Sequence, residues 1–177
     1  QESVSEAWAD HSIPIVTHQA VVIETIYMCS DPSLTEAGLH LMDEGRSSVF
    51  SLSHHSGKFQ ISCNGKQVSL PVDFIAGQFY GIRITIDPIF HTLLLQIDSQ
   101  TVANLPSPSS PIAYIGFGTG QKGNGFIQVV YLSAHAGYIV RERFFTALDG
   151  KIPDDWKVTG QPFLIELPYE RNADVLS

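Results

Sequence analysis

The chain has 177 residues, a length that fits one domain with a substantial buried core. It carries 18 acidic and 10 basic residues, a formal net charge of -8, and its basic residues are scattered. Nucleic-acid binding needs clustered phosphate-neutralising side chains, so we expect no nucleic-acid partner. No apolar run approaches the roughly 20 residues that a membrane-spanning helix needs, so we also expect no membrane partner.

The cellular compartment has only indirect indicators. The sequence begins at Gln1 without a methionine or an apolar leader, as in a chain whose signal peptide was removed or a segment cut from a longer protein. Two cysteines, Cys29 and Cys63, each fall in an expected strand. They are either two small buried free thiols or a disulfide across neighbouring strands, and a disulfide would suit a secreted protein. Neither has the spacing of a zinc site.

The first half of the chain alternates strands and turns after an irregular start over 1–17, where Trp8 and the pair Ile13-Pro14 are the expected anchors. Asn64-Gly65 is a strong hairpin signal between two of the strands. The strands are expected at Ala20–Cys29, Gly38–Met42, Ser47–His54, Lys58–Cys63 and Gln67–Val72.

The central stretch, 79–106, reads as two strands joined by a tight turn at Asp87-Pro88. Isoleucine occupies every second position from Ile82 to Ile86, with Arg83 and Thr85 between. A period of two is typical of a half-buried antiparallel strand. We therefore expect the isoleucines to face a core.

Two further strands, Ile112–Gly118 and Gly125–Ser133, are apolar on both faces and enclose a Gly-rich loop. A single short helix is expected at Val140–Leu148, because Asp149-Gly150 offers a C-cap. Regularly spaced strands punctuated by turns predict an all-β fold, a two-sheet sandwich or barrel.

These residues carry a family resemblance over roughly 20–137. The phrase Asp98-Ser99-Gln100-Thr101-Val102-Ala103 resembles a "D-G-x-x-V-A" corner, and Ile115 to Gly118 (IGFG) precedes a Gly-rich loop and an aromatic strand. The pattern resembles the concanavalin A-like, laminin-G-like jelly roll found in secreted carbohydrate-active enzymes. The resemblance implies an antiparallel jelly-roll β-sandwich, a secreted protein, and a polysaccharide or glycan as partner.

The last segment departs from that pattern. Residues 148–166 resemble the opening phrase of such modules, so we divide the chain into a sandwich (1–147) and a C-terminal extension (148–177). The extension either starts a further module, or completes the sandwich through a strand at Phe163–Leu167, or is a tail packed on the surface by Trp156.

No catalytic residue is predicted. Glucan-cleaving members of the fold resemble one another in an "E-x-D-x-x-E" strand, and glycosidases need paired carboxylates. Asp43 and Glu44 are adjacent, so on a strand they would point to opposite faces. The lyase branch resembles a "Q-I-H" strand, which Gln60-Ile61-Ser62 does not complete. A catalytic jelly roll remains an alternative.

The histidines are weighed as ordinary residues first. His54-His55 is expected in a solvated turn, and the alternative is a contact with a sugar or a metal ion. His40 is expected at the surface or as a hydrogen-bonded core residue. No cofactor is expected, although a structural calcium ion is left open, because Asp31, Asp43 and Asp98 lie at turns.

Sugar binding calls for an exposed aromatic face and a few planar polar side chains. Each tyrosine among the candidates has the alternative of being a core residue with its hydroxyl at the rim. Positions opposite the expected core, together with one strand end, supply the candidates: Tyr27, Arg83, Gln96, Tyr114, Gln128, Tyr131 and His135.

The resemblance and these candidates together favour a non-catalytic carbohydrate-binding or accessory module of a secreted glycoside hydrolase, sialidase or polysaccharide lyase. The alternative is a structural or protein-interaction sandwich that braces an adjacent domain or subunit.

Overall fold

The computed structural model describes residues 8–13, 20–119, 125–135, 140–142 and 157–159, and only the backbone of His135 and of the last two ranges. Within these ranges the chain forms 13 strands and no helix. No described segment is a helix long and apolar enough to span a membrane.

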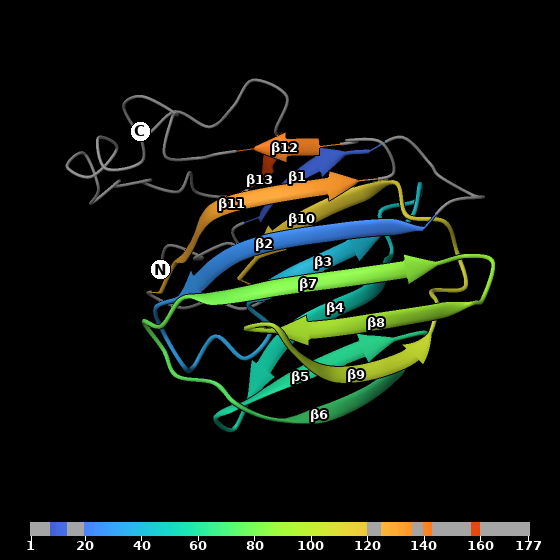
Figure 1. Ribbon diagram of the computed structural model, residues 1–177. Coiled ribbons are helices and arrows are strands. Elements are labelled where there is room, and N and C mark those ends of the chain that lie inside the picture. Colours follow the sequence, from blue (N-terminus) through green and yellow to red (C-terminus); the bar gives the residue numbers. More distant parts are fainter. Residues whose placement is uncertain (1–7, 14–19, 120–124, 136–139, 143–156, 160–177) are drawn as a thin grey trace, which may run out of the picture.

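The strands form two antiparallel sheets that lie in layers, with β2, β7 and β8 in front of β3, β4 and β5 in Figure 1. Sheet A has seven strands, in the order β13 (Lys157–Thr159), β1 (Trp8–Ser12), β10 (Tyr114–Gly118), β3 (Gly38–Met42), β4 (Ser48–His55), β5 (Lys58–Cys63) and β6 (Lys66–Asp73). Sheet B has six, in the order β12 (Val140–Glu142), β11 (Ile127–His135), β2 (Val21–Cys29), β7 (Tyr80–Asp87), β8 (Thr92–Ile97) and β9 (Gln100–Pro106).

The core lies between the two sheets, and alternation within each strand decides which residues enter it. On β7, Ile82, Ile84 and Ile86 are 2%, 0% and 7% exposed, while Arg83 between them is exposed on the other face. Burying each such side chain contributes about 1.5–3 kcal/mol relative to leaving it in water. The expected core position of the alternating isoleucines is confirmed.

Most strand bounds agree with the sequence expectation, and two differences have a common cause. Gly38–Met42 and Lys58–Cys63 are strands as predicted, and the others shift by one or two residues. The expectation of an irregular start was wrong at β1, where Trp8–Ser12 pairs with Gly118–Tyr114. The expected helix was wrong at Val140–Glu142, which pairs with Ala134–Leu132, and 143–148 lie outside the described residues. β1 gains its hydrogen bonds from β10, far along the chain, and β12 gains them from β11, the strand just before it. Local propensity does not reveal either pairing.

The segment after residue 148 contributes one described strand, β13, which pairs with β1 at the edge of sheet A. The strand expected at Phe163–Leu167 and the anchor Trp156 lie outside the described residues. The division into 1–147 and 148–177 stays a prediction.

Both cysteines are buried and free, which agrees with the first of the two alternatives. Cys29 lies on β2 of sheet B and Cys63 on β5 of sheet A. Burial raises the pKa of both thiols, so the thiolate is disfavoured at each position.

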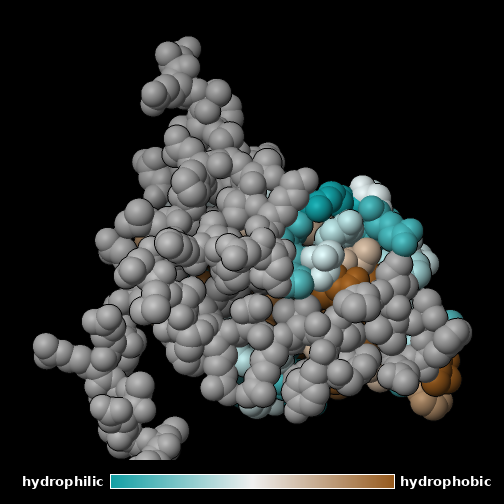
Figure 2. Space-filling model, turned by 90° about the horizontal axis from the view of Figure 1, so that it is seen from above, coloured by the Kyte–Doolittle hydropathy of each residue, from teal (hydrophilic) through white to brown (hydrophobic). Residues whose placement is uncertain are grey.

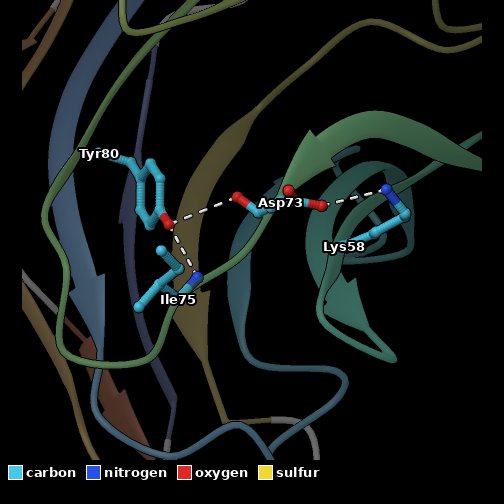
Figure 3. Close-up of polar contacts among 4 residues, drawn as sticks. All are labelled: Lys58, Asp73, Ile75 and Tyr80. Atoms are coloured by element: carbon cyan, nitrogen blue, oxygen red, sulfur yellow. Dashed lines mark hydrogen bonds and ion pairs between the residues drawn. The ribbon is translucent and has the colours of Figure 1, made fainter.

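Tyr80 ties the start of β7 to the segment that leads out of β6. Its hydroxyl accepts a hydrogen bond from the Ile75 amide at 2.8 Å and donates to the Asp73 carbonyl at 3.5 Å (Figure 3). The Asp73 side chain also pairs with Lys58 at 3.1 Å, which joins β6 to β5. This end of the sandwich is thus held by contacts between the two sheets.

Exposed apolar side chains gather away from the core as well. Ile89 and Phe90, in the turn between β7 and β8, are 67% and 76% exposed. Figure 2 shows brown apolar surface bordered by teal polar residues on the described part of the molecule. Brown also marks its right-hand edge, and the turn between β7 and β8 lies on the same side in Figure 1. Asp87 stabilises the turn, because its Oδ1 accepts hydrogen bonds from the amides of Ile89 and Phe90 at 2.9 and 3.0 Å.

Candidate functional site

Two of the predicted site residues meet on the outer face of sheet B. Arg83 and Gln96 are direct partners across β7 and β8. Arg83 forms an exposed ion pair with Glu24 at 3.3 Å, and Gln96 donates to Thr101 Oγ1 at 3.4 Å. Both side chains therefore bind partners within sheet B, and the residues in register with them, Glu24 and Thr101, include no aromatic ring.

Three further candidates lie on β11, two strands from β7 in the same sheet. Gln128 is opposite Met28, and Tyr131 follows a register shift and donates to Ser133 Oγ at 2.9 Å. His135 ends the strand opposite Val22, and only its backbone is described. Sheet B therefore carries six of the seven candidates, including Tyr27 of β2, but does not gather them into one cluster.

Tyr27 is not on an outer face. It is 1% exposed, its ring packs against Phe117 of the other sheet at 5.8 Å, and burial raises the pKa of its hydroxyl. This position agrees with the alternative that a candidate tyrosine is a core residue. Tyr27 cannot offer a ring face to a sugar.

Tyr114 is the candidate that lies on sheet A, and it belongs to a compact group of side chains on the outer face. We call this group the Asp10 cluster: Trp8, Asp10, His40, Arg46 and Tyr114. The group comes from β1, β3 and β10, adjacent strands of sheet A, and from the turn between β3 and β4.

Asp10 is the centre of the cluster. Its carboxylate is 2% exposed and accepts hydrogen bonds from Trp8 Nε1 at 3.2 Å and from Arg46 Nη1, with which it also forms an ion pair. The Arg46 guanidinium lies 4.3 Å from the centre of the Tyr114 ring, within the range of a cation–π contact. A buried carboxylate is stable only with such partners.

Trp8 lies over a strip of glycine on β10. Gly116 and Gly118 alternate with the buried Ile115 and Phe117, so their missing side chains fall on the outer face. A Cβ at Gly118 would lie 1.9 Å from Trp8 Cε3, and one at Gly116 would lie 3.0 Å from Trp8 Cζ2. The two glycines are what lets the indole lie close to the sheet.

His40 completes the cluster beside the indole of Trp8. Its ring meets Trp8 edge-on, with centroids 4.8 Å apart, and its Nδ1 lies 3.4 Å from Ser48 Oγ. Burial lowers the pKa of His40 to about 4, against a smaller opposing effect of the Glu36 backbone. Its Nε2 is buried and has no hydrogen-bond partner in the described structure. His40 is therefore a neutral, packed side chain at neutral pH, and its contact with Ser48 Oγ agrees with the expected hydrogen-bonded core position.

A row of small polar side chains continues from the cluster across sheet A. Residues in register share a face, and the pairs His40–Ser51, Ser51–Ser62 and Ser62–Gln67 lead from β3 to β6. The neighbouring row on β4, β5 and β6 is Ser53, Gln60 and Ser69. We call the six serine and glutamine residues of these two rows the polar strip: Ser51, Ser53, Gln60, Ser62, Gln67 and Ser69. The cluster and the strip therefore lie across six adjacent strands of sheet A, from β1 through β10, β3, β4 and β5 to β6.

The histidine pair beside this face divides between core and solvent. His54 is 2% exposed and stacks on Phe74, so the expectation of a solvated turn was wrong for His54, while His55 is exposed. His54 alternates inward with Phe50 and Leu52, as its position on β4 requires.

Sequence reasoning missed Trp8, Asp10, His40 and Arg46 as a group. The signal that was present is the alternation of glycine with large apolar residues at 115–118, which indicates that a bulky group covers the glycine face. Which group covers it depends on the pairing of β1 with β10.

The described residues include no group of three or more His, Cys, Asp and Glu side chains placed to hold a metal ion. The three aspartates considered for calcium accept backbone hydrogen bonds: Oδ1 of Asp31 and of Asp43 accepts from the amides of Ser33 and Ser47 in the same turn. Oδ1 of Asp98 accepts from the Gly81 amide of the neighbouring strand β7. A calcium ion stays an untested expectation.

The comparisons with known proteins concern the fold. No protein-family model matches the chain, and no curated protein sequence matches it. Solved structures do match: a sialidase (16% identity, TM-score 0.54, 67% of this chain and 11% of that chain) and an alginate lyase, AlgAT5, from Polysaccharide Lyase family 7 (10%, 0.55, 73% and 62%). A tetrameric galectin from the ball sponge Cinachyrella sp. matches at 14% identity and TM-score 0.52, over 71% of this chain and 97% of the galectin.

The chain thus spans about a tenth of the sialidase and less than two thirds of the lyase. At these identities the likeness concerns the backbone architecture alone. Two antiparallel sheets packed face to face, with these structural neighbours, show that the chain has the concanavalin A-like jelly-roll fold.

Proposed function

We propose that the chain is a non-catalytic carbohydrate-binding or accessory module of a secreted glycoside hydrolase, sialidase or polysaccharide lyase, and that it binds a glycan on the outer face of sheet A. The observation that carries the proposal is the Asp10 cluster with its adjoining polar strip. Trp8 and Tyr114 supply rings on which pyranose C–H groups stack, and the strip supplies hydroxyl and amide groups for sugar hydroxyls. The printed names of the structural neighbours, a sialidase, an alginate lyase and a galectin, agree with a glycan ligand.

The chemistry of the cluster favours binding over catalysis. Glycoside hydrolysis uses two carboxyl groups that flank the bond. In the described part of this face the cluster holds one carboxylate, Asp10, which is buried and bonded to two donors. The unpartnered Nε2 of His40 is buried, so it has no access to a substrate proton without a rearrangement.

An array of immobilised polysaccharides tests the proposal. We expect retention on at least one polysaccharide. Trp8→Ala and Tyr114→Ala are each expected to lower the affinity about tenfold or more, because truncating an aromatic anchor commonly costs about 2 kcal/mol of binding free energy. Arg83→Ala, on sheet B, is the matched control and is expected to bind normally. Retention that depends on Arg83 and not on Trp8 would move the site to sheet B, and no retention on any polysaccharide would refute the proposal.

The alternative of a bracing or protein-interaction sandwich is favoured by the exposed pair Ile89 and Phe90. It predicts self-association or association with an adjacent domain through the turn between β7 and β8. Sedimentation velocity over a range of concentrations would show this association in the native chain, and its loss in Phe90→Ser.

A further inference from the structure

Two described basic side chains of sheet A and its adjoining turn, Arg46 and Lys58, are paired with carboxylates. Arg46 is bonded to Asp10, and Lys58 lies 3.1 Å from Asp73. The register also places Lys157 of β13 opposite Asp10. Asp10 therefore stands next to Arg46 and at a register position shared with a second basic residue.

Arg46 has both of its main recognition modes occupied within the protein. An arginine recognises carboxylates through its fork of N–H donors and aromatic rings through its planar face. Arg46 directs Nη1 to Asp10 and lays its guanidinium over Tyr114, although its side chain is 39% exposed. The turn that presents it is fixed, because the Arg46 amide donates to the Asp43 carbonyl at 3.0 Å.

The remainder of the described face is uncharged next to the cluster. The polar strip consists of serine and glutamine side chains, which donate and accept hydrogen bonds without a net charge. A ligand read by such groups is matched by its hydroxyls and not by acidic substituents.

We propose that Asp10 makes this face selective for uncharged polysaccharides, because it neutralises the arginine that would attract the carboxylates of uronic or sialic acid units. Asp10 is in this sense a specificity-determining residue of the glycan site, and the inference rests on the function proposed above. The described residues of this face offer no free positive charge to the carboxylates of an acidic polysaccharide. These carboxylates would lose their hydration on binding without gaining an ion pair in return.

Affinity electrophoresis with neutral and uronate-containing polysaccharides tests the native chain. We expect binding to a neutral glucan, xylan or galactan, with less than about a twofold change in affinity between low and high salt, because screening acts on charged contacts. We expect no comparable retention by alginate or polygalacturonate. Stronger, salt-sensitive retention by the acidic polymers would overturn the inference while leaving glycan binding intact.

Asp10→Asn is the sharpest variant. The amide keeps the shape of the side chain and an oxygen that accepts a hydrogen bond from Trp8. The Arg46 guanidinium loses its carboxylate partner, so its positive charge is no longer neutralised. We expect about a tenfold gain in affinity for uronate polysaccharides, the size of one charge-assisted contact, and this gain disappears at high salt. The double variant Asp10→Asn/Arg46→Gln is expected to lack the gain, and Asp10→Asn/Lys157→Gln to retain it.

Unchanged selectivity in an Asp10→Asn protein that melts normally and still binds the neutral polymer would overturn the inference. If Asp10→Asn does not fold, Arg46→Gln provides the test. The ratio of its affinities for acidic and neutral polysaccharides is expected to equal that of the native chain, and a lower affinity for the acidic polysaccharides would contradict the inference. Absence of any polysaccharide binding by the native chain is a different result, since it refutes the proposed function itself.

Discussion

His54 and Phe74 lie parallel inside the sandwich, with ring planes 9° apart and centroids 3.7 Å apart. Phe59 meets the Phe74 ring edge-on at 5.5 Å and the Tyr80 ring at 4.8 Å, so the histidine is part of an aromatic group between the sheets. Its Nε2 is buried without a hydrogen-bond partner in the described structure. Burial is the main reason that the pKa of His54 is lowered, against opposing effects of the Pro32, Asp31 and Ala37 backbone and of the Asp31 charge.

The lowered pKa of His54 predicts that acid destabilises the fold. The unfolded chain binds a proton at His54 near pH 6.5 and the folded chain binds it only at lower pH, so the stabilisation is complete above about 6.5 and is lost as pH falls. His40 acts in the same direction between about 6.5 and its pKa of about 4, with a contribution on the order of 3 kcal/mol. We expect His54→Phe to reduce this pH dependence, measured by urea unfolding from pH 8 to pH 4.5.

The exposed neighbour His55 provides the control, since His55→Gln should leave the pH dependence of the native chain unchanged. An unfolding free energy of His54→Phe that falls with pH as steeply as that of the native chain would contradict the assignment of the slope to His54.

Gly118→Ala is expected to displace Trp8 and to weaken glycan binding. The new Cβ would lie 1.9 and 2.2 Å from Cε3 and Cζ3 of the indole, closer than any real contact, so the ring must move. We expect a loss of about 1–3 kcal/mol in the free energy of unfolding and reduced retention on the polysaccharide that the native chain binds. Gly81→Ala is the matched control, because its nearest contact is an ordinary 3.6 Å to Asp98 Oδ1. Equal stability and binding for the two variants would refute the role of the glycine strip.

Tyr80→Phe is expected to loosen the connection between β6 and β7. The change removes the hydroxyl that bonds the Ile75 amide and the Asp73 carbonyl (Figure 3). Because Ile75 is exposed and water can replace part of the contact, we expect a loss of about 1 kcal/mol, with faster hydrogen exchange at the Ile75 amide. Tyr114→Phe, whose hydroxyl has no hydrogen bond in the described structure, should not change that exchange rate. Protection of Ile75 that is unaltered in Tyr80→Phe would show that the hydroxyl does not hold the segment.

Arg83→Ala is expected to change stability by less than about 0.5 kcal/mol. Its ion pair with Glu24 is 3.3 Å long, but the two side chains are 52% and 33% exposed, and exposed pairs are screened by water. Thermal unfolding at low and high salt measures the effect, with Ile84→Ala in the adjacent core position as the contrasting variant. Ile84 is 0% exposed, so its truncation should cost about 2–5 kcal/mol. A loss for Arg83→Ala approaching that of Ile84→Ala would mean that the pair is structural.

The sandwich itself was predictable because its signal is local. Alternation over Ile82–Ile86 states which side of one strand is apolar, and Asn64-Gly65 states where two strands turn. The chain could therefore be divided into strands, and the resemblance supplied their arrangement as a jelly roll. The short strands β1 and β12 were missed because pairing with β10 and β11, and not local propensity, makes them strands.

The candidate site was predictable only in part, and Tyr114 shows why. Alternation places Tyr27 and Tyr131 at strand positions just as it places Tyr114, but it does not say which face lies against the other sheet. Tyr27 turned out to be buried, Tyr131 to face outward on sheet B, and Tyr114 to contact Arg46.

By itself the sequence determined that this protein is built of antiparallel strands with an isoleucine- and leucine-rich interior, because the period of apolar residues is a property of neighbours in the chain. Only the tertiary structure decided that Trp8, Asp10, His40 and Tyr114 share one face, because three strands that are far apart in sequence become adjacent through hydrogen bonds between β1, β10 and β3. Long-range register is the sum of many weak pairings across the whole sheet, and no single stretch of residues contains it.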